Sequence, residues 1–184
     1  SITLILGANN TLPTAVPQPL QLVSITGGRP VLDLDGNTNT CSGITLSAGA
    51  ASSVNGARSS IIDSVGGGVL KLGGGGVAYN AGGTGQNGTA TVSATLDLNG
   101  GNRAFNIADS TFTSVEVQVN GAIVNSVGTA GIIKNGSGVL VLAGTNSYNG
   151  NTTVNGGTLQ LNVACLNPAA YVAIVTTNNA LLNL

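Results

Sequence analysis

Short runs of alternating aliphatic and polar residues recur along the whole chain. The clearest lie at residues 32–34, 70–72, 96–98, 115–119 and 159–161. A spacing of two residues between aliphatic side chains is typical of a strand that buries one face. We therefore predict short strands whose aliphatic residues face a core. The polar residues between them are predicted to face solvent: Asp33, Lys71, Asp97, Glu116, Gln118 and Gln160.

The segments between these runs are rich in Asn-Gly and Gly-Gly pairs, which turn a chain sharply because both residues tolerate positive φ. No stretch keeps apolar residues at helical spacing over three turns. The run Gly73–Gly76 is followed by neither a Lys-Ser/Thr pair nor a helix, so we predict a flexible corner and no phosphate-binding loop. Residues 11–20 hold three of the five prolines, which predicts a loop or an extended arm.

Two stretches of the chain are similar to each other. Residues 60–73 (SIIDSVGGGVLKLG) and 131–143 (GIIKNGSGVLVLA) share two isoleucines, a Gly-rich turn and Gly-Val-Leu-x-Leu; residues 91–99 and 153–162 form a second pair. Stacked coils place each repeat in the same environment, whereas an antiparallel sandwich needs no self-similarity. The repeats therefore favour a solenoid. We predict that Leu140 and Leu142 point inward and that Val141, aligned with Lys71, points outward.

The composition is typical of a thin aliphatic core. Hydrophobic residues make up 42% of the 184 residues, aromatic residues 3% and charged residues 6%, against about 25% charged residues in an average domain. We predict an all-β parallel β-helix, or β-solenoid, without substantial helix and with a single domain over residues 1–184. Coils of about 20–25 residues would number about eight.

The clearest repeat, residues 131–162, resembles the autotransporter-associated β-strand repeat, also called the passenger-associated transport repeat. The positions that carry the resemblance are Lys134, Gly136, Gly138, Leu140, Leu142, Gly144, Asn146, Tyr148, Gly150, Thr152, Val154, Gly157, Thr158, Leu159 and Leu161. The region 60–80 looks like a degenerate copy that keeps Tyr79, and residues 1–50 match poorly.

This resemblance implies a right-handed β-helix that a Gram-negative bacterium secretes or displays on its surface. Such repeats occur in the passengers of surface adhesins, where a translocator domain follows. None is evident in these residues, so we expect either a fragment or a separately secreted subunit.

Three functions are compatible with these observations. The first is the structural subunit of an extracellular fibre, in which copies stack head to tail through the apolar terminal strands at SITLIL and ALLNL. The second is an adhesin-like passenger fragment, with glycans of a cell surface or matrix as possible partners. The third is a carbohydrate-active enzyme, which is disfavoured because the chain has no histidine and no cluster of acids. We expect no enzyme activity and no cofactor.

Few residues are candidates for binding chemistry. Asp33, Asp35 and Asn37 offer oxygen ligands for Ca²⁺, but a polar outer face that ends in a turn explains the same residues. Tyr79 and Tyr148 either stack on sugars or, as we prefer, pack over turns. A net charge of −1 without a basic patch argues against nucleic acid, and no apolar run is long enough to span a membrane.

The two cysteines, Cys41 and Cys165, lie about five coils apart if each coil has roughly 25 residues. A disulfide needs Cα atoms within about 7 Å, so they should not pair within one subunit. We hypothesise an intermolecular Cys41–Cys165 disulfide between stacked copies. The alternative is two isolated thiols that act as small hydrophobic residues.

Overall fold

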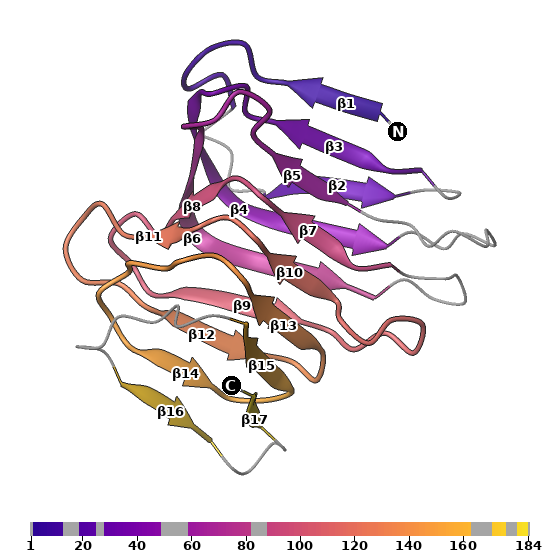
Figure 1. The fold of residues 1–184 in the computed structure, drawn as a ribbon, viewed down its shortest axis with the longest axis vertical. Coiled ribbons are helices and arrows are strands. Elements are labelled where there is room, and N and C mark those ends of the chain that lie inside the picture. Colours follow the sequence, from indigo (N-terminus) through magenta and orange to yellow (C-terminus); the bar gives the residue numbers. More distant parts are fainter. Residues whose placement is uncertain are drawn as a thin grey trace.

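The computed structural model describes residues 2–12, 19–24, 28–48, 59–81, 88–162, 171–175 and 180–183. Residues 13–18 of the proline-rich stretch, Cys165 and Leu184 lie outside this description. Within it every element is a β-strand, every strand pairing is parallel, and there is no helix. The predicted parallel β-solenoid is confirmed. Figure 1 shows the strands stacked from the N-terminal to the C-terminal end.

Two sheets form the walls of the solenoid. Sheet A contains, in spatial order, β1 (Ile2–Ile5), β3 (Pro30–Asp33), β5 (Ser60–Ile62), β7 (Ala90–Val92), β10 (Val117–Val119), β13 (Val139–Leu142), β15 (Thr158–Leu161) and β17 (Leu181–Asn183). Sheet B contains β2 (Leu20–Ser24), β4 (Thr38–Ala48), β6 (Val69–Asn80), β8 (Thr95–Asp97), β9 (Arg103–Ile107), β11 (Ile123–Val124), β12 (Ile132–Asn135), β14 (Thr152–Val154) and β16 (Val172–Ile174).

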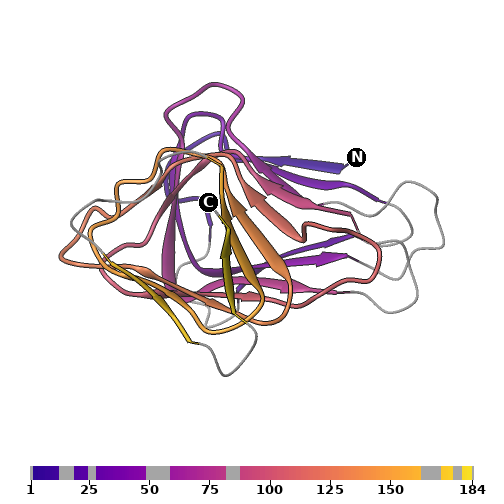
Figure 2. The same cartoon turned by 60° about the horizontal axis from the view of Figure 1, so that its bottom comes forward.

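Sheet B bends into two arms at the long strands β4 and β6. The first part of β6 pairs with β8, which pairs with β11, whereas its last part pairs with β9 and then β12. The run Gly73–Gly76 forms this bend, as predicted for a corner, but the corner is tightly packed. A Cβ at Gly73 would lie 2.9 Å from Cα of Ser42, and one at Gly76 would overlap the carbonyl oxygen of Ala104. Figure 2 shows the coils winding around one interior.

The coils in the N-terminal half are longer than those that follow. Leu32 pairs with Ile61, 29 positions later, whereas Leu140 pairs with Leu159, 19 positions later. The longer early coils leave about five complete turns in the described residues, so the predicted eight coils are an overestimate.

Aliphatic side chains stack in columns inside the solenoid. One column runs through sheet A and consists of Leu32, Ile61, Val92, Val119 and Leu142, which are 0–2% exposed. Each stacks on the next because parallel strands in register place equivalent residues about 4.8 Å apart. The predicted inward orientation of the aliphatic residues is therefore confirmed for this column.

Residues 60–73 and 131–143 are similar in sequence, but they do not occupy equivalent positions in the solenoid. The earlier segment runs from sheet A into the first arm of sheet B, whereas the later one runs from the second arm into sheet A. Both corners show the same alternation and the same glycine turn, so the sequence does not distinguish them. Val141 nevertheless points outward as predicted, because it alternates with buried Leu140 and Leu142 and pairs with the partly exposed Gln118 and Gln160 on neighbouring strands. Its side chain is only 2% exposed, so it is covered on that face. Tolerance of lysine at position 141 stays a prediction.

Candidate functional site

The segment 131–162, here called the repeat segment, spans β12 to β15 and therefore about one and a half coils. Its strands pair with the preceding coil through β9 and β10 and with the following one through β16 and β17. Its polar residues contact neighbouring coils at several corners. These contacts are the most distinctive chemistry of the described residues.

Lys134 occupies an inward position of β12, in register with Phe105 and Val154. It is fully buried, and its Nζ donates hydrogen bonds to the carbonyl oxygens of Asn135 at 3.0 Å, Gly136 at 2.8 Å and Gly156 at 3.0 Å. Burial lowers the pKa of Lys134 to about 8, although the negative charge of Glu116 opposes this. The ammonium thus joins two turns of neighbouring coils from inside.

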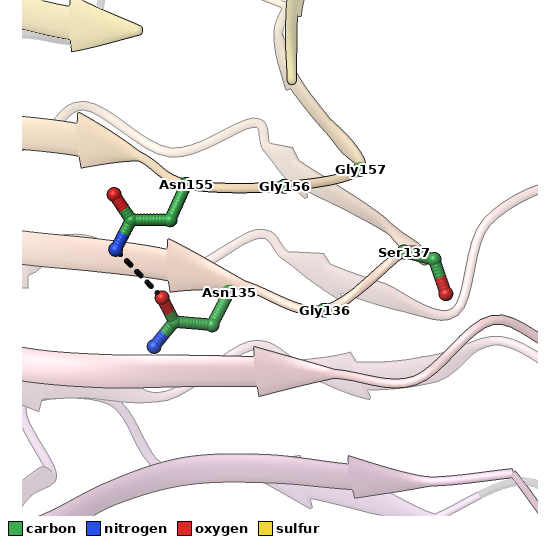
Figure 3. A pocket seen from close by; sticks show the side chains of 6 residues that line it. All are labelled: Asn135, Gly136, Ser137, Asn155, Gly156 and Gly157. Atoms are coloured by element: carbon green, nitrogen blue, oxygen red, sulfur yellow. Dashed lines mark hydrogen bonds between the residues drawn. The ribbon is translucent and has the colours of Figure 1, made fainter. Parts of the chain in front are cut away.

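Three asparagines form a ladder on the outside of the same corner. The Asn135 amide donates to Oδ1 of Asn106 at 2.9 Å, and the Asn155 amide donates to Oδ1 of Asn135 at 2.9 Å. Figure 3 shows the second of these bonds. Sequence reasoning missed the ladder, although an asparagine at the same strand position in successive coils was a usable signal. Stacked amides of this kind tie parallel coils together.

The ladder borders a shallow hollow of about 320 Å³ between two turns. Asn135, Gly136 and Ser137 line one side, and Asn155, Gly156 and Gly157 line the other (Figure 3). The lining carries amide, hydroxyl and backbone groups but no carboxylate and no basic side chain. In the part of the chain that the structure describes, no group of three metal-ligating residues comes together.

Asn146 and Tyr148 belong to the repeat segment and lie inside the solenoid. Oδ1 of Asn146 accepts the Ile123 N–H of the preceding coil at 2.7 Å. The Tyr148 hydroxyl is 2.6 Å from Oγ1 of Thr152. Tyr148 and Tyr79 are each 1% exposed, so neither ring is accessible to a sugar. The preferred packing role is confirmed, and sugar stacking at these two residues is excluded.

Three polar residues predicted to face solvent are buried instead: Asp33 at 6%, Asp97 at 1% and Glu116 at 0% exposure. Their carboxylates accept backbone N–H groups at corners, where the alternation of a strand no longer applies. Asp97 accepts N–H groups of Asn99 at 2.8 Å and Ser126 at 3.0 Å. The Asp33 corner is built in the same way, with N–H groups of Asp35 and Ser64, each at 3.0 Å.

Two of the three calcium candidates, Asp33 and Asn37, already have side-chain partners within the protein. The bond from the Ser64 N–H contributes most to lowering the pKa of Asp33 below 3.8. Asp35 lies in the turn with a φ of 49°, and the Asn37 amide donates to the carbonyl oxygens of Leu6 at 2.8 Å and Asp35 at 2.9 Å. These contacts match the alternative of a polar segment that ends in a turn. Calcium binding here stays a prediction.

The family of one segment can be named. The family model of the passenger-associated transport repeat matches residues 132–161. Residues 132–161 are a passenger-associated transport repeat. The contacts of Lys134, Asn146 and Asn155 thus show what this repeat does in the present chain, which is to join one coil to the next.

A comparison with curated proteins agrees with this assignment. Over 62 residues the chain is 45% identical to the "Adhesin BmaC autotransporter" of Brucella suis biovar 1 (strain 1330). The matched stretch is 33% of this chain and 2% of the Brucella protein, so the chain spans only a small part of that relative. No solved structure matches the chain significantly. None of the described residues forms a helix long and apolar enough to cross a membrane.

Glycines of the passenger-associated transport repeat allow close approach of the preceding coil. A Cβ at Gly144 would overlap the carbonyl oxygen of Gly121, and one at Gly157 would lie 2.5 Å from that of Gly136. Both neighbouring atoms belong to the backbone, which cannot move without breaking hydrogen bonds between the coils. The spacing of these glycines therefore reflects contact between coils.

Replacing Gly144 by Ala should destabilise the protein by about 2–4 kcal/mol, because overpacking against a backbone carbonyl forces the coils apart. Urea unfolding followed by circular dichroism measures this. Gly74→Ala is the matched control, since nothing lies within 4 Å of its Cβ position, and it should change stability by less than about 0.5 kcal/mol. Equal effects of the two substitutions would contradict the proposed contact.

Cys41 is a free thiol that points into the core from β4, opposite Leu72, and is 4% exposed. The predicted intermolecular disulfide with Cys165 finds no support, and Cys165 lies outside the described residues. Burial raises the pKa of Cys41 to about 11 from an ordinary 9.0. The alternative of a small buried hydrophobic residue fits Cys41.

The Cys41 thiol should make the protein sensitive to alkali. Its contribution to stability is complete below pH 9 and is lost as the pH rises toward 11, because only the unfolded chain ionises readily in that range. Between pH 8 and pH 10 the wild type should lose about 1 kcal/mol more stability than Cys41→Ala. Urea midpoints of both proteins at the two pH values measure this. Parallel losses would show that the thiol does not contribute.

Proposed function

We propose that this chain is a section of the extracellular passenger of an autotransporter adhesin from a Gram-negative bacterium. The observation that carries the proposal is the 45% identity to an autotransporter adhesin over 62 residues. The match of residues 132–161 to the passenger-associated transport repeat also supports it. The section serves as a scaffold whose stacked coils hold adhesive parts of a longer protein away from the cell.

The contacts between coils are consistent with a scaffold role. Lys134, the asparagine ladder and the close-packed glycines all join neighbouring coils, and none of them presents a reactive group to solvent. A non-enzymatic role follows from this proposal. Cleavage of polysaccharides by the pure protein, lost on replacing Asp33 or Asp35, would argue for an enzyme instead.

Surface display tests the proposal directly. The chain is inserted into an autotransporter passenger and produced in a Gram-negative host, and intact cells are treated with protease and an antibody against the chain. A folded, antibody-accessible and protease-resistant section is expected outside the cell. Retention of the section in the periplasm would contradict the proposal, provided that the same passenger without it reaches the surface.

The fibre-subunit hypothesis makes a different prediction for the isolated chain. Head-to-tail stacking should give filaments in negative-stain microscopy, whereas a passenger section should remain unpolymerised. Exposed apolar residues at the outer strand β1, including Ile2 at 81% and Ile5 at 58%, fit either case. Microscopy of the purified protein at several concentrations separates the two.

A further inference from the structure

Two buried carboxylates each connect consecutive coils. Asp97, at the end of β8, accepts the Ser126 N–H at 3.0 Å and the Ser126 hydroxyl at 2.5 Å, and Ser126 follows β11 in the next coil. Glu116, just before β10, accepts the N–H of Val139 at 2.6 Å, and Val139 begins β13 one coil further on. Glu116 also accepts the Ser110 N–H at 3.1 Å. Both side chains are at most 1% exposed.

Charged and titratable groups from several strands face these carboxylates. Lys71 of β6 places Nζ 3.9 Å from Asp97, and the guanidinium of Arg103 in β9 interacts electrostatically with the same carboxylate. Glu116 interacts electrostatically with buried Lys134 of β12 and with the Tyr79 phenol of β6. Each carboxylate therefore balances positive charge as well as accepting backbone bonds.

Protonation changes the hydrogen bonds that a buried carboxylate can make. An ionised carboxylate only accepts hydrogen bonds, whereas a carboxylic acid carries one O–H donor. Around Asp97 the neighbouring groups are N–H and O–H donors, so a proton there leaves one of them poorly paired. At Glu116 both oxygens accept backbone N–H groups. A buried donor without an acceptor is costly.

We propose that Asp97 forms an acid-sensitive joint that loosens the contact between β8 and β11 when its carboxylate is protonated. The Asp33 carboxylate, which accepts the Ser64 N–H of the next coil, forms a second corner of the same kind. A passenger section with these corners loosens at them on entering an acidic medium.

The direction of the effect follows from the state of Asp97. Burial raises its pKa, but the bonds from Ser126 and Asn99 and the charge of Lys71 outweigh burial, and the pKa lies below the ordinary 3.8. A carboxylate whose pKa is lowered on folding stabilises the folded protein at pH values above its ordinary pKa. This stabilisation is lost as the pH falls through the lowered pKa. The loosening is expected below about pH 4.

An amide takes the place of a carboxylate in a related corner of the same chain. The Gly36 N–H is accepted by Oδ1 of Asp63 at 2.7 Å, and the Gly100 N–H is accepted by Oδ1 of Asn125 at 2.9 Å. Asn125 thus holds its corner without titrating. Asp97→Asn is accordingly a conservative change that keeps an acceptor but removes the proton site.

Hydrogen exchange of single amides tests the joint. In the wild type, protection of the Ser126 amide should fall several-fold, at most about sevenfold, between pH 6 and pH 3, relative to the Ala143 amide, which bonds to the Val119 carbonyl. Asp97→Asn should abolish this fall at Ser126. Asp109→Asn, which changes an exposed carboxylate, should behave as the wild type.

Two outcomes would overturn the proposal. One is a constant ratio of Ser126 to Ala143 protection in the wild type over the whole range, and the other is an undiminished fall in Asp97→Asn. The carbon-13 chemical shift of the Asp97 carboxyl group in the wild type provides a test that needs no variant. Its titration must coincide with the loss of protection at Ser126, and separate midpoints would refute the joint.

Discussion

Replacing Leu142 by Asp should abolish the folded state. Leu142 is fully buried in the aliphatic column of sheet A, where Val119 and Leu161 pair with it on the neighbouring strands. An ionised carboxylate there has no positive partner and no water, which costs about 5 kcal/mol or more. Since the whole protein is expected to have about 5–15 kcal/mol of stability, the substitution should leave little native protein at 25 °C. Circular dichroism and size-exclusion chromatography measure the loss.

The control for this substitution lies on the same sheet. Gln160 alternates with Leu159 and Leu161 on β15 and is partly exposed, with its amide bonded to Oδ1 of Asn162 at 2.8 Å. Gln160→Asp should cost less than about 1 kcal/mol, because the new charge remains hydrated. A stable Leu142→Asp protein together with an unfolded Gln160→Asp protein would show that the register is shifted by one residue.

Replacing Lys134 by Met should destabilise the protein by about 3–5 kcal/mol. The change removes the donor for the carbonyl oxygens of Asn135, Gly136 and Gly156 and leaves buried Glu116 without its nearby positive charge. Removing one member of a buried charge pair has this order of effect. Methionine has a similar length, so packing against the core is largely retained. Urea unfolding at pH 7 gives the difference in the free energy of unfolding.

Lys71→Met serves as the comparison for Lys134. The Lys71 side chain is 35% exposed, and its ammonium lies 3.9 Å from Asp97. A partly exposed ion pair contributes about 0–1 kcal/mol, so this substitution should cost no more than that. Equal losses from both lysine substitutions would mean that the buried bonds of Lys134 do not stabilise the turns.

The fold class followed from the sequence because its signal is local and repeated. Leu32, Leu96 and Leu159 each belong to a run with a period of two, and each is buried as predicted. Glycine and asparagine between the runs correctly marked the turns. At the C-terminal end, Leu181 is exposed and Leu182 packs against the core, so the alternation continues in β17.

The assignment of runs to particular sheets did not follow from the sequence. A run of Val-Leu-x-Leu after a glycine turn looks the same at every corner, so residues 69–72 and 139–142 were aligned although they belong to different sheets. Only the register between strands distinguishes them, and register is a property of the assembled stack. The strand pattern correctly placed Val141 on the outer face of sheet A, but it did not indicate that this side chain is buried there.

The candidate site was harder to predict because several of its polar residues are buried. Asp97 and Glu116 each stand between aliphatic residues, and this alternation indicates an exposed side chain. Both, however, lie where a strand meets a corner. Asp97-x-Asn99-Gly100 was a usable signal, since an aspartate before Asn-Gly often binds its own turn. Lys134 shares the phase of Ile132, which already placed it inward, but charge argued against a buried position.

The parallel stacking of coils determines how the protein should respond to mechanical force. The backbone hydrogen bonds between coils run along the stack. Tension applied between the two ends of the stack therefore loads the terminal coil first and releases the coils one after another. Each released coil supplies between 19 residues, as between Leu140 and Leu159, and 31 residues, as between Ile61 and Val92. At about 3.4 Å per extended residue, each step lengthens the tether by about 65–105 Å. A stretched section would therefore absorb load in separate steps, and the shortest step would be the coil between β13 and β15.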